Sequence, residues 1–170
     1  VATLEGLRPL LSGSDAPRAA LTASMASLMP TDETLVDAML AGDEAKALQR
    51  AEELAGTEAA QSIYSSTKAA ICRWMRRVAA GPDWAGAGIP LNAIGPGVVV
   101  TPMTADLMAT EEQRESLSHM VPMPLNGFME ATAPAELLAW LISPVNTHVC
   151  GQVVFIDGGS DVVIRGDSTW

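Results

Sequence analysis

Three short and almost wholly apolar segments alternate with longer helical patterns along this chain, and this alternation restricts the fold more than any other feature of the sequence. The segments 19–24, 89–94 and 152–156 each predict a strand that is buried on both faces. Helices are expected over the ranges 1–11, 31–42, 44–54, 57–80, 111–119 and 134–142. Such strands, separated by helices, indicate an α/β protein whose parallel sheet is covered by helices on both faces.

Length and charge narrow the classes of protein. A chain of 170 residues is long enough for one domain with one sizeable core. It carries 20 acidic against 10 basic residues, which gives a formal net charge of −10. Because phosphate binding needs clustered Lys and Arg, this balance argues against a nucleic-acid partner and against an anionic membrane surface.

Cysteine, histidine and hydropathy patterns exclude further classes. Cys72 and Cys150 share no metal-ligand spacing, and His119 lies far from His148, so neither a disulfide framework nor a metal site is expected. Two long uncharged stretches are interrupted by Pro, Gly and polar residues, and the chain does not open with a signal-peptide pattern. We therefore expect no membrane span and a cytoplasmic location.

Tyr64 and Lys68 are the first residues that could be catalytic. Four residues apart in a predicted helix, they share one face, so the phenol and the ammonium can reach the same point. A cation beside a phenol favours the phenolate, which allows proton exchange near neutral pH. The Tyr-x-x-x-Lys pattern alone is weak, and a solvated helix face explains it more simply.

Two further features follow strand ends. A predicted strand runs into Pro96 and Gly97, at the edge of the sheet where open α/β folds bind ligands, and Thr101 adds a hydroxyl beyond it. Gly97 would let a ligand approach the backbone closely. Ser24 stands at the end of an earlier strand. Taken singly, the first feature fits an ordinary strand-to-loop turn, and the second fits a serine that caps a strand end.

Together the three features resemble the short-chain dehydrogenase/reductase family. Four segments carry the resemblance, which extends from residue 1 to about residue 160: ALTASMAS (20–27), YSSTK (64–68), LNAIGPGVVVTP (91–102) and GQVVFIDGG (151–159). The resemblance implies a Rossmann-like, doubly wound parallel sheet. It implies that Ser24 holds the substrate oxygen, that Tyr64 transfers the proton, and that Lys68 assists Tyr64 and binds the nicotinamide ribose. It also implies a loop that holds the nicotinamide end of NAD or NADP through Pro96, Gly97, Val99 and Thr101.

The sequence departs from the family in two places. Family members open with a glycine-rich turn for the cofactor pyrophosphate, and no G-x-G-x-x-G pattern is present here. Residues 1–170 therefore resemble the C-terminal portion of a single Rossmann-like oxidoreductase domain, and they do not encode the choice between NAD and NADP. A helical insertion at about 31–56 separates Ser24 from Tyr64. Together with the downstream DWAG (83–86), it resembles the bacterial 3α-hydroxysteroid dehydrogenase/carbonyl reductase subgroup.

The segment after Thr101 is rich in methionine, which bears on the substrate. Such side chains suit an adaptable apolar pocket, and they also suit simple core filling; they are Met103, Met108, Met120, Met123 and Met129. With the resemblance, the first reading implies a small apolar alcohol or ketone that exchanges a hydride with the cofactor.

Two other functions remain open, and so does the assembly. The chain could be a catalytically silent fragment that acts only in assembly, or a family member that catalyses epimerisation or dehydration. Residues 31–56 carry an apolar set too large to leave in water: Leu35, Val36, Met39, Leu40, Leu48 and Leu54. With the resemblance, this set predicts a homodimer in which the insertion contributes to the interface.

Overall fold

The computed structural model describes residues 1–168, and a three-stranded parallel sheet lies at its centre. The strands are β1 (Ala19–Thr22), β2 (Leu91–Pro96) and β5 (Val153–Ile156), in the order β1-β2-β5. Leu21 is paired with Ala93, and Gly95 with Phe155. All six residues of β2 are buried, as expected for a central strand that is covered on both faces.

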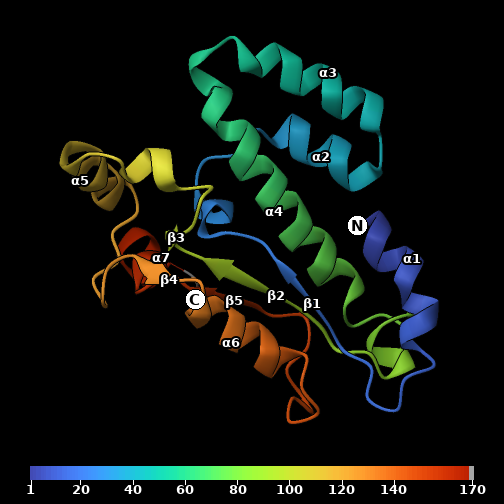
Figure 1. The fold of residues 1–170 in the computed structure, drawn as a ribbon. Helices are drawn as coiled ribbons and strands as arrows, with labels where there is room; N and C mark the ends of the chain where they lie inside the picture. The colour runs from blue at the N-terminus through green and yellow to red at the C-terminus, as the bar shows by residue number, and fades with distance from the viewer. Residues whose placement is uncertain (169–170) are drawn as a thin grey trace.

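Helices cover the sheet on both sides, so the predicted α/β architecture is confirmed. Figure 1 shows α1 (Ala2–Leu11) and α4 (Gln61–Val78) on one side of the strands and α6 (Thr132–Leu141) on the other. A 3-10 turn, η2 (Glu58–Ala60), precedes α4, so the predicted helix over 57–80 consists of two parts. Within the described residues, no helix is both long enough and apolar enough to cross a bilayer.

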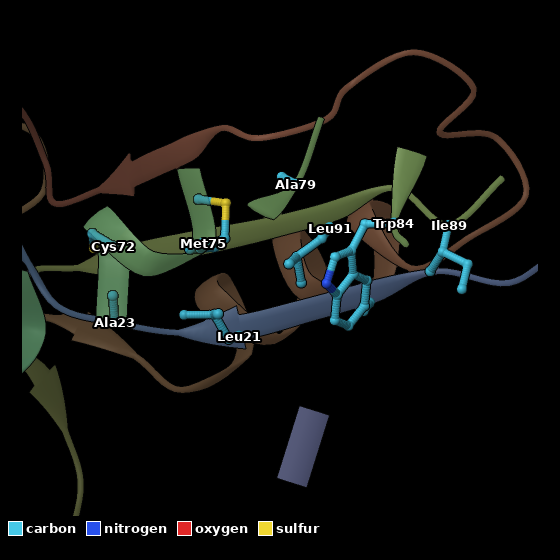
Figure 2. Close-up of a cluster of buried hydrophobic side chains, with 10 residues drawn as sticks. Leu21, Ala23, Cys72, Met75, Ala79, Trp84, Ile89 and Leu91 are labelled. Atoms are coloured by element: carbon cyan, nitrogen blue, oxygen red, sulfur yellow. The ribbon is translucent and has the colours of Figure 1, made fainter. Parts of the chain in front are cut away.

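The main core lies between α4 and the sheet. Figure 2 shows its side chains, among them Met75 of α4 and Trp84, Ile89 and Leu91 from the chain that leads into β2. These four side chains are at most 1% exposed. Trp84 follows the helix and precedes the short turn η3 (Ala85–Ala87), and its ring meets that of Trp74 edge-on at 6.5 Å. This contact fixes the return of the chain from α4 to β2.

The predicted strand 89–94 is shifted toward the C-terminus in the structure, where β2 includes Gly95 and Pro96. The sequence analysis assigned these two residues to a turn. The sheet extends through them because the Phe155 ring lies over Gly95, where a Cβ atom would be only 2.5 Å from Cδ1 of the ring. Gly95 is therefore required by a neighbouring strand, and it does not mark the end of its own.

The insertion is a helical hairpin of α2 (Glu33–Ala41) and α3 (Glu44–Ala55), at the top of Figure 1. Side-chain caps begin both helices, because Asp32 accepts from the backbone N–H of Leu35 and Asp43 from that of Lys46. Gly42, with a φ of 72°, ends α2 in the left-handed conformation. The two predicted helices are thus confirmed, although the first begins two residues later and ends one residue earlier than the predicted range 31–42.

The apolar residues of the hairpin are covered mainly by their own chain. Leu35 and Leu54 are 0% and 5% exposed in a cluster against which Ile63 of α4 packs, and Val36 is also fully buried. Only Leu48 is largely exposed, at 58%. Most of the set therefore packs within its own chain, where α4 supplies much of the surface, and the homodimer stays a prediction.

Three elements near the sheet edge were not predicted. Two-residue strands β3 (Val99–Val100) and β4 (Met129–Glu130) form a small parallel ladder. A short helix, α7 (Ser160–Arg165), follows the turn at Asp157. The predicted helix near 111–119 is present as α5 (Glu111–Met120), preceded by η4 (Ala105–Met108), and η1 (Met25–Leu28) follows β1.

Candidate active site

Helix α4 presents Tyr64 and Lys68 on the same face, as their spacing predicts. The Lys68 ammonium lies 5.4 Å from the centroid of the Tyr64 ring. Tyr64 is 53% exposed, so a ligand can reach its side chain. The pair can therefore serve proton transfer at the surface of a cleft.

Ser65 and Ser66, which follow Tyr64 in α4, are held by hydrogen bonds to another part of the chain. Ser65 Oγ donates to the carbonyl of Pro30 at 2.5 Å, and the backbone N–H of Asp32 donates to Ser66 Oγ at 2.9 Å. Both serines are buried. They bind α4 to the segment that leads from β1 into the insertion, and so they fix how far Tyr64 is turned outward.

Ser24 lies just after β1, and its hydroxyl can both accept and donate a hydrogen bond. Its Oγ accepts from the backbone N–H of Ala26 at 3.1 Å, which caps η1. This is the capping role that the sequence left open. Because a hydroxyl can accept and donate at once, the Ser24 proton is still available for an oxygen of a ligand.

Ser24 and Tyr64 both line a cleft of about 940 Å³, whereas Lys68 lies beside the Tyr64 ring but is not in the lining. The lining of the cleft comes from four parts of the chain: the end of β1 with η1, the segment that leads into α2, the turn η2 with the start of α4, and the segment 97–121. The size is within the range of small-molecule sites. Ser24, Tyr64 and Gly97, proposed from separate segments of the sequence, thus border one space.

The loop after β2 is only partly in that lining. Gly97 and Val98 border the cleft, whereas Pro96, Val99 and Thr101 are absent from its lining in the part of the chain described. A Cβ atom at Gly97 would be 3.0 Å from both Asp157 Cα and Met123 Sδ. The packing of the chain itself therefore favours glycine at this position, and the expected approach of a ligand to Gly97 stays a prediction.

Thr104 is a site residue that the sequence analysis missed. Its hydroxyl donates to the carbonyl of Val99 at 2.6 Å and accepts from the backbone N–H of Thr101 at 3.1 Å. It also lines the cleft. A threonine three residues after Thr101 resembles many loop threonines, so only the folded geometry identifies it as the residue that fixes this loop.

The Met-rich segment combines both roles that the sequence left open. Met108 and Met123 are buried with Met25 and Val98 in a second core cluster. Met103 and Met120 line the cleft, where they are 87% and 56% exposed. One pair therefore fills the core while the other supplies flexible apolar surface to the cleft.

Ion pairs stabilise the border between the insertion and α4. Arg50 of α3 forms a bidentate pair with Asp32, at 2.8 and 3.2 Å, and these hydrogen bonds hold the pKa of Asp32 below its usual value. Arg73 of α4 pairs with Glu33 at 2.6 Å and lowers the pKa of that carboxyl to about 2. Both carboxylates are therefore ionised and paired at neutral pH.

The residues present are compatible with the nicotinamide end of a dinucleotide. Lys68 forms no ion pair with any residue from 1 to 168, so its ammonium protons are available to ribose hydroxyls. A glycine-rich turn for the pyrophosphate is not in this sequence. Across the same residues, no three His, Cys, Asp or Glu side chains are grouped so as to hold a metal ion.

Comparison with known proteins gives a consistent result. A profile described as enoyl-(acyl carrier protein) reductase matches residues 17–161. The 3-alpha-hydroxysteroid dehydrogenase/carbonyl reductase of Comamonas testosteroni is 34% identical over 95% of this chain and 62% of its own length. A galactitol 2-dehydrogenase of Cereibacter sphaeroides is 37% identical over 59% of this chain and 38% of its own.

A solved structure agrees in fold. The 3-alpha-hydroxysteroid dehydrogenase from Pseudomonas sp. B-0831, complexed with NADH, superimposes with a TM-score of 0.86 at 37% identity, over 98% of this chain and 64% of that one. The chain thus spans somewhat less than two thirds of the length of these two hydroxysteroid dehydrogenases. On the profile match, the relatives and the fold, this chain belongs to the short-chain dehydrogenase/reductase family.

Proposed function

We propose that this chain belongs to an NAD(P)-dependent oxidoreductase that interconverts a secondary alcohol and a ketone. One observation carries the proposal: Tyr64, beside the Lys68 ammonium, and Ser24, with its hydroxyl proton available, border the same cleft. A proton-transfer group and a donor to a carbonyl oxygen are the two groups that such a reaction requires of the protein.

In the direction of oxidation, Tyr64 takes the hydroxyl proton while Ser24 donates to the substrate oxygen and orients it. The Lys68 ammonium lies beside the ring of Tyr64 and places a positive charge there. The nicotinamide cofactor, when bound, supplies the redox chemistry as hydride acceptor. Of this chain, Lys68, Tyr64 and the loop residues would hold its nicotinamide end; those residues are Pro96, Gly97, Val99 and Thr101. Thr104 orders that loop.

The substrate that fits best is a small, largely apolar alcohol or ketone of the hydroxysteroid or carbonyl-reductase class. The exposed Met103 and Met120, with Leu107, give the cleft an apolar surface. The names of the Comamonas and Pseudomonas relatives support this class.

The test is a substitution that removes only the phenolic hydroxyl. The variant is made in protein that also carries a dinucleotide-binding segment. Tyr64→Phe should lower kcat by roughly 10²–10⁴-fold or more, because general acid–base catalysis typically contributes that much. Thermal stability should change little. Lys68→Met should weaken cofactor binding, because it removes the ammonium that would donate to the ribose hydroxyls. If Tyr64→Phe keeps more than about a tenth of the activity, the assignment is wrong.

The two alternative functions give different readouts. Epimerisation or dehydration would produce turnover with no net change in NADH absorbance. A silent chain would show no Tyr64-dependent turnover with any alcohol or ketone.

We also propose a homodimer whose interface includes the insertion. Because Leu35 and Val36 are buried within their own chain, we assign that part of the interface to the outer face of α3 around the exposed Leu48. Light scattering should give twice the monomer mass, and Leu48→Ser should weaken the dimer without unfolding it. A monomeric wild type would refute the dimer. An unaffected Leu48→Ser dimer would place the interface elsewhere.

A further inference from the structure

The candidate cleft is bordered by two surfaces of opposite character. The segment 97–121 supplies side chains that are mostly apolar: Val98, Met103, Leu107, Leu117, Met120 and Val121. The segment before α2, the turn η2 and the start of α4 supply mostly polar ones: Thr31, Asp32, Glu58, Gln61 and Ser62. A ligand that fills the cleft therefore meets an apolar surface and a polar one.

The polar surface carries one uncompensated charge. Asp32 is paired with Arg50, which balances its charge. Glu58 is exposed and takes part in no ion pair within residues 1–168. No Lys, Arg or His belongs to the lining of the cleft in the described chain. An anionic group placed near Glu58 would meet repulsion with no cation in the lining to offset it.

We propose that Glu58 is a specificity-determining residue, which makes the cleft select neutral amphipathic alcohols and ketones against otherwise identical anionic ones. The proposal rests on the proposed function for the identity of the reacting group. It extends that function by assigning to the turn η2, which connects the insertion to α4, the choice among substrates by charge.

The effect of Glu58 depends on distance along the substrate. Glu58 and Tyr64 are six residues apart, through the end of η2 and the first turn of α4. At the rise of such turns, six residues correspond to about 9–10 Å of backbone length along the helix axis. A carboxylate at about that distance from the reacting carbonyl would be repelled, whereas one held close to the carbonyl would be affected less.

The experiment uses ketones in matched pairs. The long pair is para-acetylbiphenyl carboxylate and its methyl ester; the short pair is para-acetylbenzoate and its methyl ester. Because residues of this chain line the cleft, binding can be measured directly by titration calorimetry, without turnover. At neutral pH and low salt, the long acid should bind roughly three- to fivefold more weakly than its ester, because Glu58 repels its carboxylate. The effect is this small because the Glu58 carboxylate is exposed and water screens its charge.

Two variants of equal charge change complete the design. Glu58→Gln should bring the long acid to within about twofold of its ester and leave the short pair unchanged. Glu52→Gln, on the exposed face of α3 outside the cleft, should leave all ratios as in the wild type. Salt near 1 M should screen the charge of Glu58, so the affinities of the long acid and its ester for the wild type should become more similar, as they do in Glu58→Gln.

Three results would overturn the inference: equal binding of long acid and ester by the wild type, an unchanged ratio in Glu58→Gln, or an equal change in Glu52→Gln. Absence of binding by the long ester would overturn the assignment of the cleft itself. The proposed function fails separately, through the activity of Tyr64→Phe, so the two outcomes are distinguishable.

Discussion

Replacement of Gly95 by alanine should change the free energy of unfolding, and the sign of the change should depend on the ring of Phe155. The added Cβ would lie 2.5 and 2.6 Å from two carbons of Phe155, about 1 Å inside an ordinary carbon–carbon contact. The Phe155 ring has Arg165 against one side, 5.6 Å from its centroid, so a displacement of the ring would cost packing. Overpacking of this kind destabilises by about 1–3 kcal/mol.

The same substitution should become harmless once the ring is removed. The φ of Gly95 is not positive, so alanine can adopt its backbone conformation. In a Phe155→Ala background, Gly95→Ala should therefore be neutral or stabilising by about 0.4–1 kcal/mol, because alanine restricts the unfolded chain. The two backgrounds should differ by about 2 kcal/mol, well above the error of a double-mutant cycle.

Urea unfolding followed by tryptophan fluorescence measures all four proteins of the cycle. The denaturant slopes should be similar, so that the midpoints report stability. If Gly95→Ala destabilises equally in both backgrounds, the ring is not the reason for the glycine, and the account of β2 given above is wrong.

Three other predictions follow from the packing and the polar contacts. Leu35→Ala should cost about 2–5 kcal/mol in urea unfolding, since Leu35 is fully buried in the hairpin cluster, whereas Leu48→Ala should cost under about 0.5. The Glu33–Arg73 pair stabilises the fold at pH values above the usual carboxyl pKa of 4.5, and this contribution is lost as the pH falls toward the lowered pKa of about 2. The difference in stability between the wild type and Arg73→Gln should therefore shrink as the pH falls through that range. A constant difference would exclude the ion pair as its cause. Thr104→Val should raise the hydrogen-exchange rate of the Thr101 amide roughly tenfold by removing its acceptor, and unchanged protection would show that another group holds the loop.

The sequence predicted the elements that rest on local chemistry. Asp32 and Gly42 mark the ends of α2 through capping and a left-handed turn, which depend only on neighbouring residues. The face shared by Tyr64 and Lys68 follows from helix geometry alone. These features could be predicted because no distant part of the chain decides them.

The features that escaped prediction depend on distant contacts. β3 and β4 have two residues each, too few for a hydrophobic pattern, and they exist because they pair with each other. The extension of β2 through Gly95 depends on Phe155, 60 positions later in the chain. The burial of Leu35 depends on α4, so no count of apolar residues in the insertion could show that its own chain covers it.

The hydrogen bonds of Ser65 and Ser66 have a consequence for how α4 tolerates change. They set the rotational register of the helix from its buried side, so the direction of Tyr64 does not depend on contacts made by its own ring. Loss of the Tyr64 hydroxyl therefore leaves the scaffold in place, and catalytic measurements on that variant report chemistry alone. Substitutions at the two serines should do the reverse, because they leave every reactive group present and let the helix rotate about its axis.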